Sequence, residues 1–72
     1  MKITYDNTVD AAYIYLVDSI GQGEVAHTYP CNPIEVNGEI NLDFDSNGRL
    51  LGIEVLDASQ KLPVALLLRM RE

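Results

Sequence analysis

The stretch that most constrains the fold is Ile40 to Asp57, INLDFDSNGRLLGIEVLD, because two alternating runs flank the dipeptide Asn47-Gly48. Asn and Gly tolerate the positive φ angles of a type I′ turn, so the stretch predicts a β-hairpin with a two-residue loop. This register puts six apolar side chains on one face. The facing pairs are Phe44 with Leu51, Leu42 with Ile53, and Ile40 with Val55. A three-residue loop, which pairs Asp45 with Arg49, mixes the two faces, and we reject it.

Length and charge limit what such a chain can be. Seventy-two residues, 47% of them hydrophobic, predict a single domain over residues 1–72, with so little buried surface that oligomerisation or a partner is expected. A net charge of −6 argues against direct contact with nucleic acid or an anionic membrane surface. The lone Cys31 excludes an internal disulfide, and no apolar run suits a signal peptide or a membrane span, so we expect a cytoplasmic protein.

Three further stretches predict strands because they alternate in polarity or are rich in β-branched and aromatic residues. They are Lys2 to Tyr5, Ala11 to Val17 and Glu24 to Tyr29. A helix is the rival interpretation of Ala11 to Val17. Pro30 and Pro33 should end the pairing of the third strand in a loop or at a sheet edge, and Ile34 to Val36 is expected to be a short extended piece.

The carboxy-terminal part predicts helix. Asp57-Ala58-Ser59-Gln60 resembles a capping box, and Pro63 either ends that turn or begins a helix from Val64 to Arg71. So short a helix must dock on something. The expected fold is therefore α+β, a small and mostly antiparallel β-meander of four to five strands with a C-terminal helix packed on one face. The residues expected under that helix are Leu42, Phe44, Leu51, Ile53 and Val55.

The hairpin also matches a calcium-binding pattern. Asp43, Asp45, Asn47 and Glu54 have the spacing of oxygen ligands in an EF-hand loop, with Gly48 at the sharp turn. The flanking helices that an EF-hand needs are missing, and the outward face of a strand pair accounts for the same residues, with Gly52 opposite Asp43. We expect no metal site here, and no heat from a calorimetric titration with millimolar calcium.

No catalytic or cofactor constellation stands out. Asp6 with Asp10 is a carboxylate pair on paper, but acid and base chemistry needs a pocket that separates their pKa values. His27 and Cys31 are too few for a metal site and lack an orienting partner for nucleophilic catalysis. The prediction is that the protein is not an enzyme and needs no cofactor.

Apolar and aromatic residues outside the hairpin are candidates for a partner or dimer surface. Alternation puts Tyr13 and Tyr15 on one side of their strand, and an all-round apolar segment follows Pro63. The candidate residues are Tyr13, Tyr15, Val64, Leu66, Leu67, Leu68 and Met70.

The motifs of the chain resemble those of the short bacterial and archaeal proteins of domain of unknown function family 2283. The matching steps are Tyr5-Asp6, Asp10-Ala11, Leu42-Asp43-Phe44-Asp45, Gly52-Ile53-Glu54-Val55 and Asp57-Ala58-Ser59. The resemblance implies a small α+β fold without an established activity or catalytic residues. Because similar proteins are sometimes encoded beside toxin-like proteins, it also suggests an antitoxin-like role.

The functional expectation combines these points. We expect a non-enzymatic protein-interaction module, with an antitoxin-like partner of a basic protein as one form of it. The alternatives are a self-associating homodimer without another partner, and a calcium or small-ligand binder that uses the hairpin carboxylates.

Overall fold

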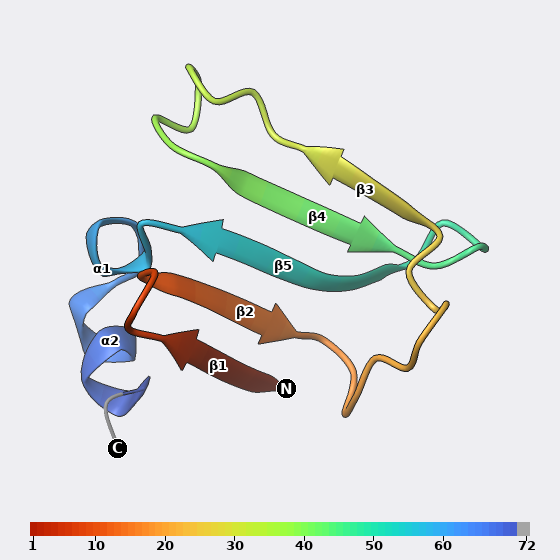
Figure 1. The fold of residues 1–72 in the computed structure, drawn as a ribbon, viewed down its shortest axis with the longest axis horizontal. Coiled ribbons are helices and arrows are strands. Elements are labelled where there is room, and N and C mark those ends of the chain that lie inside the picture. Colours follow the sequence, from red (N-terminus) through yellow and green to blue (C-terminus); the bar gives the residue numbers. More distant parts are fainter. Residues whose placement is uncertain (71–72) are drawn as a thin grey trace.

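A computed structural model describes residues 1–70 and confirms a small α+β fold with a five-stranded antiparallel sheet (Figure 1). The elements are β1 Lys2–Asp6, β2 Ala11–Tyr15, β3 His27–Pro30, β4 Ile40–Phe44, β5 Leu50–Leu56, α1 Ala58–Lys61 and α2 Val64–Met70. Arg71, the predicted last residue of the helix, lies outside the described residues.

The strand order is β1-β2-β5-β4-β3, and every neighbouring pair is antiparallel. Two hairpin-connected units build this order. One is β1 with β2, and the other is the meander β3, β4, β5. The units join where β2 pairs with β5, so the predicted hairpin strand β5 becomes the centre of the sheet and β1 and β3 become its edges.

The outer register of the central hairpin is the one the sequence predicts, with Ile40 opposite Val55 and Leu42 opposite Ile53. The turn itself was predicted wrongly. The Asp45 N–H donates to the Arg49 carbonyl at 2.9 Å, which is the pairing rejected above, and leaves a three-residue loop.

The turn is three residues long because the Asp45 side chain organises it. Its carboxylate accepts the N–H groups of Asn47 and Arg49, both at 2.9 Å, and Gly48 supplies the positive φ of 80°. A register shift next to Asp43 and Phe44 then brings the two strands back into phase, so that Phe44 faces Leu50 instead of Leu51.

The edge strand β3 is shorter and shifted relative to its prediction. Pro30 lies inside it opposite Asn41, and the Cys31 N–H still donates to the Ile40 carbonyl at 2.8 Å. An edge strand tolerates proline when its missing N–H is not needed for the ladder. The predicted extended piece Ile34 to Val36 is wrong, because this segment is a turn whose N–H groups the Asn32 side chain accepts.

Helix α1 begins where the sequence predicts it, but the capping box is wrong. Asp57 has a left-handed φ of 53° and makes no side-chain cap bond. Asp10, at the end of the β1–β2 turn, takes that role. Its carboxylate accepts the Ser59 N–H at 2.9 Å and the Ser59 hydroxyl at 2.7 Å, and its carbonyl accepts the Ala58 N–H at 3.0 Å.

The core is small and lies under the helices. Ala12, Val55 and Ala58 form its buried centre, with half-buried side chains such as Ile14 and Ile53 around it. Helix α1 packs on β5 and α2 on β1. Both helices therefore lie at the end of the sheet where β1 and β5 finish, and β4 and β3 lie on the far side of β5 (Figure 1).

Candidate protein-interaction surface

Strand alternation gives the sheet two chemically different faces. Cross-strand partners share a face, so the pairs Tyr29 with Leu42 and His27 with Phe44 continue the apolar side that holds the core. The four residues of these pairs lie on β3 and β4, beyond the helices. We call this group, His27, Tyr29, Leu42 and Phe44, the open face.

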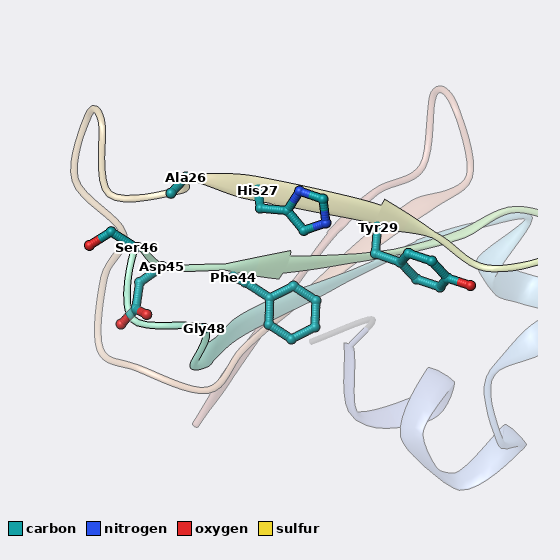
Figure 2. A pocket seen from close by; sticks show the side chains of 7 residues that line it. All are labelled: Ala26, His27, Tyr29, Phe44, Asp45, Ser46 and Gly48. Atoms are coloured by element: carbon teal, nitrogen blue, oxygen red, sulfur yellow. The ribbon is translucent and has the colours of Figure 1, made fainter.

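The open face contains a shallow hollow. Figure 2 shows Phe44 and Tyr29 on the side of the sheet where the helices lie, with Ala26 and the hairpin turn at the border. The hollow has a volume of about 570 Å³, and the His27 and Phe44 ring centres in its wall are 6.2 Å apart. Tyr29 is 53% exposed although it belongs to the apolar side. This part of the apolar face is thus accessible from solvent.

The opposite face is polar and is closed by its own side chains. The Tyr13 hydroxyl on β2 donates to the Asp43 carboxylate on β4 at 2.6 Å, and the Thr28 hydroxyl on β3 donates to the other carboxylate oxygen at 2.6 Å. Gly52 lies on β5, between Tyr13 on β2 and Asp43 on β4, and it is paired directly with Asp43. One chain of contacts thereby joins four strands.

Gly52 has no side chain because the Tyr13 ring occupies that space. A Cβ at this position would lie 2.5 Å from the Tyr13 hydroxyl oxygen. Burial, together with the hydrogen bond to the Asp43 carboxylate and its negative charge, raises the pKa of Tyr13 well above its usual range, so the phenol stays protonated as a donor.

The three carboxylates of the calcium pattern have separate structural tasks. Asp43 accepts from Tyr13 and Thr28, Asp45 from its own turn, and Glu54 from the Asn41 side chain at 2.9 Å. Among residues 1–70, no group of three or more His, Cys, Asp or Glu side chains is placed to hold a metal ion.

The two tyrosines expected at a partner surface lie on the polar face. Their rings are 4.7 Å apart in an edge-to-face arrangement, and the Lys2 ammonium lies 4.4 Å from the Tyr15 ring centre. Both rings therefore make contacts within the chain.

Helix α2 has one side against the sheet and one side in solvent. Leu66 and Met70 line a hollow of about 250 Å³ together with Ile3. Val64 and Leu68 are 70% and 60% exposed, while Leu67 is half-buried. Part of the predicted α2 surface is thus accessible and part serves the fold.

Sequence reasoning missed the open face and the role of Asp10. Asp10 accepts from the Tyr5 hydroxyl at 2.8 Å in addition to Ser59, and these hydrogen bonds hold the pKa of its carboxyl below the usual 3.8, with Ser59 as the main cause. The signal in the sequence was faint, because aspartate in a turn usually bonds its own backbone.

These features define a class, a small antiparallel α+β domain with one polar face closed by its own side chains and one apolar face covered at one end. The chain belongs to the family described as "Protein of unknown function (DUF2283)", whose profile matches residues 2–59. The matched stretch contains the whole sheet, the open face and the Asp10 cap, while α2 follows it. No curated protein and no solved structure matches the chain.

Proposed function

We propose that the protein is a non-enzymatic protein-interaction module that binds through its open face. The observation that carries the proposal is the incomplete cover of the apolar side. Five strands about 4.8 Å apart make a sheet roughly 19 Å wide, whereas a seven-residue helix is only about 10 Å long. Helix α2 contacts β1 and α1 contacts β5, so β3 and β4 receive no comparable cover. Tyr29 is 53% exposed beside the solvent-accessible hollow, and exposed apolar surface of this kind is typical of docking sites.

The polar groups support a binding role over a catalytic one. The carboxylates that acid and base chemistry would need hold the structure together, Asp10 at a helix start, Asp43 across the strands and Asp45 in the hairpin turn. A cytoplasmic location belongs to the same proposal. Within the described chain, no helix has the length and apolar character needed to cross a membrane.

The charge of the chain gives the antitoxin-like variant of this proposal its support. With a net charge of −6, the protein would attract a basic partner over a distance, and apolar contact would then hold the complex.

A comparative capture experiment tests the proposal. The full chain serves as bait in a lysate of its source organism, beside Phe44→Lys on the open face and Thr28→Lys on the polar face. Thr28 is the matched control because it is an exposed residue on β3, whose neighbours in the chain belong to the open face. We expect a chain, another protein or a tagged second copy, that binds the wild type and Thr28→Lys but not Phe44→Lys. Binding that Phe44→Lys retains would refute the use of the open face.

A further inference from the structure

We infer that the occupant of the open face is a second copy of this chain, packed sheet against sheet. The inference rests on the proposed function, since it names the partner of the same surface. Three observations point to a copy: the amount of exposed surface, the distribution of charge and the size of the core.

The exposed surface is larger than that of a monomer of this mass. A folded monomer of 8.0 kDa is expected to expose about 4,450 Å², and this chain exposes 5224 Å². The excess, about 770 Å², equals one partner's share of a standard protein interface, about 800 Å². The shape agrees, because the radius of gyration is 12.5 Å against about 11 Å expected for 72 residues.

The charge of the chain favours self-association on this side only. Each copy has a net charge of −6, so two copies repel one another wherever their carboxylates meet. The four residues of the open face include no Asp or Glu, and one carboxylate, that of Asp45, lies in the lining of its hollow. Asp43 and Glu54 point from the opposite face. Two copies in contact through their open faces would keep Asp43 and Glu54 on the outside. A basic protein, in contrast, would find a single carboxylate, that of Asp45, at the open face.

The size of the core indicates an interface that is present whenever the chain is folded. Among residues 1–70, four hydrophobic residues are buried, and two of them are alanines. Oligomerisation is one of the means by which a domain with so small a core gains stability. The partner that is always available to a folding chain is another copy, as in obligate homodimers.

The geometry allows a two-fold arrangement. Sheets that pack face to face lie about 10 Å apart, with their side chains interdigitated. In Figure 2, Phe44 and Tyr29 stand clear of the helices, so two open faces can meet while each helix pair lies at the side of the partner sheet. A two-fold axis would make the contact self-complementary and closed, which gives dimers instead of filaments.

The test is the solution mass of the full chain, measured by sedimentation equilibrium over a concentration series. We expect the wild type and Thr28→Lys to have a solution mass of twice 8.0 kDa. For Tyr29→Lys and Phe44→Lys, we expect the dissociation constant of the dimer to rise by about 30-fold or more. Tyr29 is 53% exposed, so its substitution leaves the monomer core untouched. A monomeric wild type at about 100 μM, or a dimer that both lysine variants preserve, would overturn the inference.

A second measurement needs no variant. If folding is coupled to dimerisation, the urea midpoint of the wild type rises with protein concentration, and a midpoint independent of concentration would contradict the dimer. The two proposals fail separately. A monomeric wild type that captures a different protein, with loss of capture in Phe44→Lys, refutes the second copy and retains the interaction module. Capture that Phe44→Lys retains refutes the module itself.

Discussion

Replacement of Gly52 by alanine tests how the polar face is held together. Gly52 lies in an extended strand, and the three atoms nearest to an added Cβ all belong to the Tyr13 ring, at 2.5 to 2.7 Å. Real Cβ atoms do not approach other atoms so closely. The ring must therefore move away, and it takes with it the hydrogen bond to Asp43 and the contact with Tyr15.

The expected cost follows from the contacts that the ring would lose. A hydrogen bond to a carboxylate contributes about 1.5 to 3 kcal/mol, and an edge-to-face ring pair about 0.5 to 1.5 kcal/mol. Alanine in place of glycine returns about 0.4 to 1 kcal/mol by restricting the unfolded chain. We expect Gly52→Ala to lower the free energy of unfolding by about 2 kcal/mol. In a domain of this size, that corresponds to a melting temperature lower by about 13 °C.

The assay is a double-mutant cycle with Tyr13→Ala, in which urea unfolding is followed by circular dichroism at one fixed protein concentration. Without the ring, Gly52→Ala should be neutral or slightly stabilising, which gives a coupling free energy of about 2 kcal/mol. Tyr13→Phe serves as a control, since it removes only the hydrogen bond and keeps the ring, and it should cost about 1.5 to 3 kcal/mol. An equal cost of Gly52→Ala with and without the Tyr13 ring would refute the reasoning.

Three further predictions concern the turns and the helix start. Asp10→Asn should lower the urea midpoint at neutral pH. Because the pKa of Asp10 in the folded state lies below 3.8, the stability that Asp10 contributes is present above that pH and is lost as the pH falls through the folded pKa. In a pH series, the stability of the variant should therefore fall less steeply toward acid pH than that of the wild type. Asp57→Gly should leave the free energy of unfolding unchanged or raise it, because Asp57 is left-handed and makes no cap bond. A decrease of about 1 kcal/mol, measured by thermal unfolding, would instead support the capping-box interpretation. Gly48→Ala should cost about 1 kcal/mol from its φ of 80° alone, since no atom lies within 4 Å of the added Cβ, and Gly48→Asn should recover part of that cost in the same assay.

The predictable parts of the fold were those that local pattern decides. Alternation between Ile40 and Val55 determines which side chains share a face, and it predicted the outer register and the place of Gly52 opposite Asp43. The turn was mispredicted because pattern counting ignored a side chain. The Asp45 carboxylate accepts two backbone N–H groups, and a register shift absorbs the resulting mismatch at little cost to the faces.

The unpredictable parts depend on residues far apart in the chain. Asp10 and Ser59 are 49 positions apart, and they meet because β2 inserts beside β5. The capping-box motif that begins at Asp57 does not cap this helix, because the backbone of Asp57 is left-handed and its side chain makes no cap bond. The Tyr13 contact with Asp43 likewise spans 30 positions. No periodicity in a single stretch contains such information.

The two faces of the sheet explain why the open face lies on β3 and β4. On the polar side, the Tyr13 ring on β2 lies over Gly52 on β5 and reaches Asp43 on β4, so few residues close that part of the face. On the apolar side, the face must be covered by other apolar side chains. The chain after β5 provides two short helices for this purpose, α1 with four residues against β5 and α2 with seven residues against β1. The family profile ends at residue 59, before α2 begins. Leu42 and Phe44 on β4 are therefore left half-buried on the open face, the surface at which we propose that a partner binds.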